Sequence, residues 1–122
     1  MFAKLQPRLS QFQTDYSMPD ESSLSFQNHA DQHRFEAASG GKVAGYVEYN
    51  MLSDSIMLTH TEVLPEYEGK GVGGFLARES LGAARRMGKR VIPACPFIAS
   101  YLRRHRELLD LVEPGVQRAY KI

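Results

Sequence analysis

The chain has 122 residues, of which 43% are hydrophobic and 24% are charged, with 15 Lys and Arg against 14 Asp and Glu. This length suits one domain and excludes a TIM barrel or a complete two-half dinucleotide-binding fold, which each need roughly 200 residues or more. The net charge of +1 does not favour nucleic acid as a partner.

Cys95 is the only cysteine, so an intramolecular disulfide is excluded and a reducing compartment is favoured. No apolar run approaches the roughly 18 residues of a membrane span, so no membrane partner is expected. The first ten residues lack the apolar segment of a signal peptide. Together these features predict a cytoplasmic protein.

The chain divides into two unequal parts. Residues 1–22 are rich in Gln and Ser and hold no lasting period, which predicts a loosely ordered tail or an extra N-terminal element. From residue 23 onward the pattern is that of one folded domain, 23–122.

The first half of this domain reads as an antiparallel meander. Alternating patterns predict strands over residues 24–28, 33–37, 43–51 and 56–64. Gly40 and Gly41 supply the positive φ that a tight hairpin requires.

The period then becomes helical. Apolar spacing predicts a helix from about Lys70 to Met87 that stops at Gly88, followed by a short buried strand at residues 91–93. Further short helices are expected at 97–105 and 107–112, with a final strand or tail at 115–122. The predicted class is α+β, a meander followed by helices.

The segment 65–74 joins the last meander strand to the long helix and contains four glycines. Glycines let backbone amides converge, and the helix N-terminus adds positive potential, so this turn suits an anion such as phosphate. A plain glycine-rich helix start is the alternative. The dinucleotide-binding pattern is disfavoured because the preceding strands form a meander, and no Gly-Lys pair is followed by the Ser or Thr of a Walker A loop.

With these segments the chain resembles the GCN5-related N-acetyltransferase superfamily, and more closely its small YjdJ-like branch. The stretches that carry the resemblance are residues 34–36, 44–49, 60–63, 69–74 and 93–105. The resemblance implies an acyl-CoA N-acyltransferase fold, acetyl-CoA as cofactor and an amine acceptor. The implied cofactor-binding residues are Val63, Leu64, Gly69, Lys70, Gly71, Val72, Gly73 and Gly74.

One position departs from the family motif. The motif begins with Gln or Arg, and the matching position here is Glu68. A carboxylate near a pyrophosphate opposes binding, so backbone amides and Lys70 would have to outweigh it.

His60 and Glu62 are candidates for proton transfer. In an ideal strand, alternate residues from Ile56 to Leu64 share one face, and these include His60 and Glu62. Imidazole titrates near neutrality and a neighbouring carboxylate favours its charged form. A hydrogen-bonded structural histidine is the alternative, and a bulge in the strand would break the face argument.

Cys95 and Tyr101 follow the short strand. Cys95 is a candidate nucleophile or general base, with a small buried hydrophobe as the alternative. The superfamily often uses a tyrosine in the region of Tyr101 to protonate the departing thiolate, and helix packing is the alternative.

No metal site is expected: the His29, Asp31 and His33 pattern is better explained as a polar turn. The resulting expectation is a monomeric or weakly dimeric enzyme that acetylates an unidentified amine by direct attack in a ternary complex. The alternative function is a module that binds acyl-CoA or a protein with little turnover.

Overall fold

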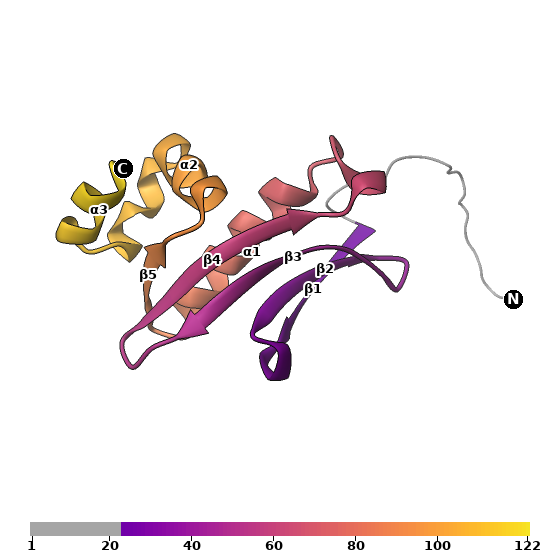
Figure 1. The fold of residues 1–122 in the computed structure, drawn as a ribbon, viewed down its shortest axis with the longest axis horizontal. Helices are drawn as coiled ribbons and strands as arrows, with labels where there is room; N and C mark the ends of the chain where they lie inside the picture. Colours follow the sequence, from indigo (N-terminus) through magenta and orange to yellow (C-terminus); the bar gives the residue numbers. More distant parts are fainter. Residues whose placement is uncertain (1–22) are drawn as a thin grey trace, which may run out of the picture.

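The computed structural model describes residues 23–122, so the predicted tail or extra element over residues 1–22 lies outside the described part. These residues form one five-stranded sheet in the order β1-β2-β3-β4-β5 with helices after the fourth strand (Figure 1). The strands are β1 (Leu24–His29), β2 (Arg34–Ser39), β3 (Lys42–Met51), β4 (Ser55–Val63) and β5 (Arg90–Pro93). The helices are α1 (Val72–Arg86), α2 (Pro96–Arg104) and α3 (Pro114–Tyr120), and short 3-10 helices span Ala30–Gln32, Pro65–Tyr67 and Arg106–Leu111.

The first four strands form the predicted antiparallel meander, and β5 then adds to β4 in parallel. Gly40 and Gly41 have φ angles of 59° and 83°, as the hairpin between β2 and β3 requires. The predicted α+β class is therefore confirmed. None of the helices in residues 23–122 is long and apolar enough to cross a bilayer.

The two faces of the sheet differ. In Figure 1, α1 lies behind the sheet, and α2 and α3 gather on the side of β5. Phe35, Val47 and Leu58 are fully buried in the same cluster as Leu76 and Ala77 of α1. The opposite face, called the open face below, carries polar side chains in neighbouring rows of β2, β3 and β4.

A bulge interrupts β4 at Thr59. His60 pairs with Glu48 of β3, whereas Leu58 pairs with Tyr49, so Thr59 is the extra residue. Its hydroxyl donates to the carbonyl oxygen of Glu48 at 3.1 Å. An extra residue reverses the alternation of side chains along a strand.

The bulge corrects the predicted face of this strand. Ile56 and Leu58 point into the core and are fully buried, whereas His60 and Glu62 lie on the open face. The prediction that all four share one face is wrong because pairing with β3 shifts by one residue between them. His60 and Glu62 still share a face with each other, since both follow the bulge.

β4 and β5 pair over only part of their length. Among residues 23–122, the parallel ladder ends at the pair Leu58 and Pro93, while β4 continues to Val63. The backbone N–H of Cys95 donates to the carbonyl of Leu58 at 2.8 Å, and the chain then turns into α2. The two strands therefore diverge, leaving one edge of β4 beyond Leu58 without a neighbouring strand in the described part (Figure 1).

Two helix predictions need correction. α1 begins at Val72 rather than near Lys70, because Gly71 has a left-handed φ of 82° and caps the helix. The residues after Gly115, predicted as a strand or tail, form most of α3. Arg103 of α2 donates to the carbonyls of Tyr120 and Lys121 at the end of this short helix, at 3.0 and 2.9 Å, which satisfies carbonyls that the helix leaves unpaired.

Candidate functional site

The glycine turn lies between the end of β4 and the first turn of α1. Gly69 and Gly71 have φ angles of 77° and 82°, which side-chain-bearing residues rarely adopt. A Cβ added at Gly69, Gly71 or Gly74 would meet no protein atom within 4 Å, so the space beside the turn is open.

The start of α1 presents unpaired donors to this space. The first helical hydrogen bond runs from the N–H of Phe75 to the carbonyl of Gly71 at 3.1 Å, so the amides of Val72, Gly73 and Gly74 have no acceptor within the helix. No side chain caps the helix and no acidic residue lies in its first turn. The helix dipole and these amides together suit an anion such as a phosphate or pyrophosphate group.

Lys70 adds a positive charge at the turn, and its ammonium nitrogen lies 6.0 Å from the centre of the Tyr67 ring. The side chain of Glu68 is exposed, directly before Gly69. Within three residues the turn therefore carries a negative charge, which repels a bound anion, and a positive charge, which attracts it.

The free edge of β4 presents backbone groups. Leu64 donates its N–H to the carbonyl of Ala44 at 2.9 Å, and Val63 is the Cα partner of Gly45. Hydrogen bonds alternate along an antiparallel pair, so the N–H and C=O groups of Val63 and Thr61 point away from β3. They point to the side where β5 has departed, and they suit the amide groups of an extended ligand.

This geometry distinguishes Val63 from Leu64, the two adjacent residues that the resemblance implies as cofactor-binding. Val63 directs its backbone groups into the gap between β4 and β5. Leu64 already uses its N–H on Ala44, and its carbonyl accepts from the N–H of Tyr67 at 2.8 Å. Thr61 was not among the expected cofactor-binding residues, yet its backbone groups point into the gap as those of Val63 do, and only the register of β3 and β4 reveals this.

Cys95 lies where the strands diverge. Its Sγ is 3.3 Å from Oγ1 of Thr61, and its side chain is only 3% exposed. Cys95 is also the residue that caps the N-terminus of α2, with extended backbone angles.

His60 and Glu62 lie together on the open face, with Nε2 of His60 2.9 Å from Oε1 of Glu62. Their side chains are 52% and 44% exposed, so solvent and ligands can reach both. The structure thus brings the predicted pair together. It places the pair on the opposite face of β4 from the contact between Thr61 and Cys95.

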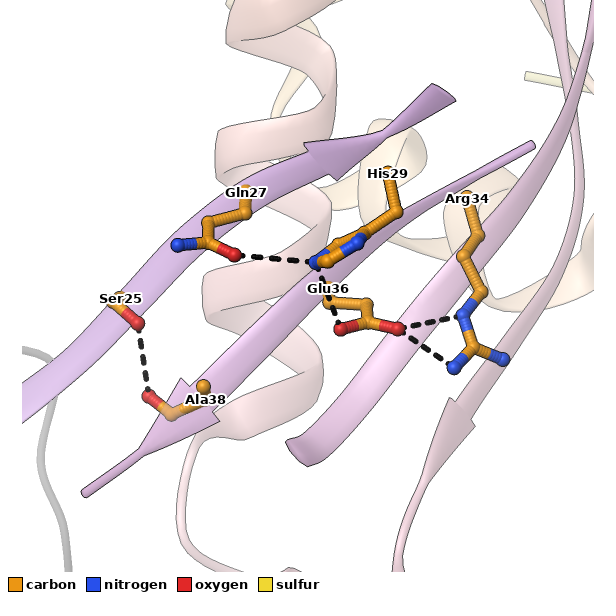
Figure 2. A network of polar contacts seen from close by, with 6 residues as sticks. All are labelled: Ser25, Gln27, His29, Arg34, Glu36 and Ala38. Atoms are coloured by element: carbon orange, nitrogen blue, oxygen red, sulfur yellow. Dashed lines mark hydrogen bonds and ion pairs between the residues drawn. The ribbon is translucent and has the colours of Figure 1, made fainter. Parts of the chain in front are cut away.

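A wider polar network continues across the open face from this pair. The His60 ring lies beside the Tyr46 ring, with centres 6.5 Å apart, and the Arg34 guanidinium lies 4.3 Å from the centre of the Tyr46 ring. Glu36 holds Arg34 at 2.6 and 2.8 Å and contacts His29 at 3.1 Å (Figure 2). Only 8% of Glu36 is exposed, so these partners compensate a largely buried carboxylate.

Tyr101 lies on α2 and is 8% exposed. Its ring stacks on His105, with ring centres 3.9 Å apart and planes inclined by 14°, and Nδ1 of His105 lies 2.9 Å from the Tyr101 carbonyl oxygen. Tyr101 also belongs to the buried core cluster, so packing within the protein accounts for its low exposure.

The described residues contain no group of three His, Cys, Asp or Glu side chains arranged to hold a metal ion. His29 is used in the network of Figure 2, whereas His33 adopts a left-handed backbone with φ of 55° at the end of the turn between β1 and β2.

Gly45, which had no expected role, and Gly73, in addition to its expected cofactor role, also shape the site through close contacts. A Cβ at Gly45 would lie 2.6 Å from the carbonyl oxygen of Glu62, so β4 can approach β3 closely only because this residue is glycine. A Cβ at Gly73 would lie 2.8 Å from Cζ of Phe97, which packs over the first turn of α1. A glycine within a strand is a recognisable signal, whereas the contact of Phe97 with Gly73 leaves no sequence signal.

Comparison with models of protein families matches residues 34–111 to a family described as GCN5-related N-acetyl-transferase. The match covers more than half of the chain and runs from β2 to the 3-10 helix after α2, so it includes the glycine turn and both sides of the gap. No curated protein gives a significant match to the chain.

Proposed function

The chain belongs to the GCN5-related N-acetyltransferase family, and from this premise we propose that it moves an acetyl group from acetyl-CoA to an amine acceptor. The observation that carries the proposal is the divergence of β4 and β5 beside an open glycine turn. Neither feature alone indicates a cofactor site, because glycine-rich helix starts and splayed strands both occur without one. Together they provide an anion site and an adjoining free strand edge.

The proposed binding mode uses both features. The amides of Val72, Gly73 and Gly74 hold the pyrophosphate. Gly69 and Gly71 have no side chains, so they keep the space beside the pyrophosphate open. Lys70 adds a positive charge. The backbone groups of Thr61 and Val63 hold the pantetheine arm along the free edge of β4, with Leu64 beside it. Acetyl-CoA, once bound, supplies the acyl group already activated as a thioester.

On the open face, we assign proton acceptance to His60 and the orientation of its ring to Glu62. Support comes from their separation of 2.9 Å and from the exposure of both side chains. A base must lie within reach of the acceptor nitrogen, and His60 is on the face that no described helix covers. The acceptor therefore approaches from the open face, while the thioester lies at the gap near Thr61 and Cys95.

The proposed reaction is direct attack in a ternary complex. The acceptor nitrogen forms a C–N bond with the carbonyl carbon as the C–S bond breaks. His60 takes the proton that the nitrogen loses, the Tyr101 hydroxyl donates one to the leaving thiolate, and solvent restores both groups. The products are an N-acetylated amine and free coenzyme A.

Cys95 has a second assignment to be weighed against direct attack. Its thiolate would take the acetyl group from the thioester, with one C–S bond formed and another broken, and would then pass it to the amine. Its position beside Thr61 at the gap between β4 and β5 supports this role, and its 3% exposure opposes it. Direct attack needs no acyl-enzyme and is the mechanism we propose.

One observation favours an acyl-CoA-binding module with little turnover as the second candidate. No element in residues 23–122 covers the open face above His60 and Glu62, so these residues would contact a bound acceptor from one side only. A partner protein or a tightly held substrate would then be needed to position the amine. We assign either activity to a monomer or weak dimer in a reducing compartment, the cytoplasm being the simplest, in keeping with the free thiol of Cys95.

Two measurements test the proposal in sequence. Calorimetry with acetyl-CoA should give one site per chain, and an absence of binding at millimolar ligand would eliminate both candidates. Release of free thiol is then followed with polyamines, small amines, lysine peptides and peptides with free N-termini. Acceptor-dependent release indicates an enzyme, whereas binding without release for every acceptor indicates a binding module.

A further inference from the structure

Phe97 is an exposed aromatic residue at the junction of three parts of the site. It lies in the first turn of α2, two residues after Cys95, and 39% of its surface is exposed. Its ring tip packs over the first turn of α1: a Cβ at Gly73 would lie 2.8 Å from Cζ and 3.4 Å from Cε1. Phe97 therefore spans from the gap between β4 and β5 to the glycine turn.

The contact with Phe97 is a reason for Gly73 to lack a side chain. This reason is separate from phosphate binding. Any Cβ at this position would displace the ring, whereas a Cβ at the adjacent Gly74 would meet no protein atom within 4 Å. Gly73 thus seats the ring. The seated ring keeps an apolar surface exposed beside the two features that the proposed function assigns to the cofactor.

We propose that Phe97 is a positioning residue for acyl-CoA, with its ring forming the apolar wall against which the pantetheine arm lies between the glycine turn and the gap. This inference rests on the proposed function. An arm of methylene and dimethyl groups gains from burial against an aromatic ring, while its amides use the free edge of β4. The adenosine and phosphate groups lie beyond the ring and do not depend on it.

The test compares two ligands by calorimetry. Phe97→Ala should weaken binding of acetyl-CoA about tenfold, and should leave binding of 3′-phosphoadenosine 5′-diphosphate, which lacks the pantetheine arm, within about twofold. Phe97→Leu, which keeps an apolar side chain, should show an intermediate loss for acetyl-CoA alone. Met87→Ala is the matched control, because Met87 is 38% exposed at the other end of α1 and should affect neither ligand.

A double-mutant cycle tests whether Gly73 serves as the seat, that is, whether its lack of a side chain allows the Phe97 ring to pack there. Gly73→Ala should weaken acetyl-CoA binding in the wild-type background, because the new Cβ displaces the ring, and should have little effect in the Phe97→Ala background. Equal losses in both backgrounds would mean that the Cβ meets the ligand directly and would overturn the assignment of Gly73 as the seat. Melting temperatures of all variants without ligand show that the proteins compared are folded.

The outcomes separate this inference from the proposed function. A wild-type protein that binds neither ligand would overturn both. A wild-type protein that binds both, with Phe97→Ala changing neither affinity or weakening both equally, would overturn only the role of Phe97.

Discussion

Oγ1 of Thr61 lies 3.3 Å from Sγ of Cys95, across the point at which β4 and β5 separate. Thr61 is one residue beyond His60 on β4, yet the two side chains lie on opposite faces of the strand. Thr61 therefore faces the Cys95 thiol at the gap, whereas the preceding residue, His60, lies on the open face. This arrangement divides the proposed chemistry between the two faces.

Replacement of Cys95 distinguishes the two mechanisms. Because direct attack needs no acyl-enzyme, Cys95→Ala should lower turnover by no more than about tenfold. The loss of an essential nucleophile would lower turnover far more. The measurement is thiol release together with intact-protein mass. Cys95 is the only thiol of the chain. An added acetyl mass that disappears when amine is supplied can therefore be assigned to Cys95 without digesting the protein into peptides. An acetylated protein that forms and decays as fast as turnover would refute direct attack.

The base assignment predicts a graded series on the open face. His60→Gln should lower kcat by about 10²- to 10⁴-fold, as for loss of a general base, with acetyl-CoA affinity unchanged. Glu62→Gln should cost less, because it removes only the partner that orients the ring. Glu48→Gln is the control: Glu48 pairs with His60 in register, but its side chain has no hydrogen bond or ion pair with His60 among the described residues. An equal loss for Glu48→Gln and Glu62→Gln would contradict the assignment.

Glu68 precedes the glycine turn with an exposed carboxylate. Removing its charge should tighten acetyl-CoA binding, so Glu68→Gln is expected to lower Kd by about threefold at low salt, with a smaller gain at high salt. Glu66→Gln makes the same change of net charge two residues earlier and should have less effect. If Glu68→Gln weakens binding instead, its carboxylate supports the turn rather than opposing the ligand.

Gly45 allows β3 and β4 to approach closely beside the gap. Gly45→Ala should destabilise the protein by about 1–3 kcal/mol, because the new Cβ would meet the backbone carbonyl of Glu62. Gly82→Ala is the matched substitution in α1, where the nearest atom is the mobile end of Arg86 at 3.2 Å. It should stabilise by up to about 1 kcal/mol through helix propensity. Denaturant unfolding measures both, and a neutral Gly45→Ala would show that the strands can move apart.

Arg85 of α1 pairs with Asp110 through two hydrogen bonds of 2.8 and 3.0 Å. The hydrogen bond from Arg85 is the main cause that lowers the pKa of Asp110 below its ordinary 3.8. A carboxylate with a lowered pKa stabilises the folded state above its unfolded pKa, and this contribution is lost as the pH falls through the folded pKa. Asp110→Asn should therefore lower the melting temperature slightly at pH 7 and make no difference once Asp110 is protonated. A difference that persists in strong acid would assign the effect to packing.

Much of the fold was predictable because its signals are local. Alternation along the chain, the pair Gly40 and Gly41, and the helical spacing after Pro65 each depend on neighbouring residues, and each predicted its element correctly. The short helix α3 was missed because its seven residues have little pattern of their own and its end is held by Arg103 from α2.

The candidate site was predictable in its residue types and less so in its arrangement. The four glycines and the pair His60 and Glu62 are visible in the sequence, and the structure places the two side chains in hydrogen-bond contact. The bulge at Thr59 is invisible there, because it arises from the register between two strands rather than from either strand alone. For that reason the sequence does not reveal Thr61 as a partner of Cys95.

The sequence by itself determined the order of the five strands, α1 and α2, the glycine turn and the chemical groups available for the reaction, because these depend on composition and on residues close in the chain. Only the tertiary structure decided which groups meet. The one-residue shift at Thr59 turns His60 away from the core, the parting of β4 from β5 frees the backbone of Val63, and the seat of Phe97 on Gly73 joins two helices. Each depends on contacts between segments distant in the chain, whose register and close packing no local pattern specifies.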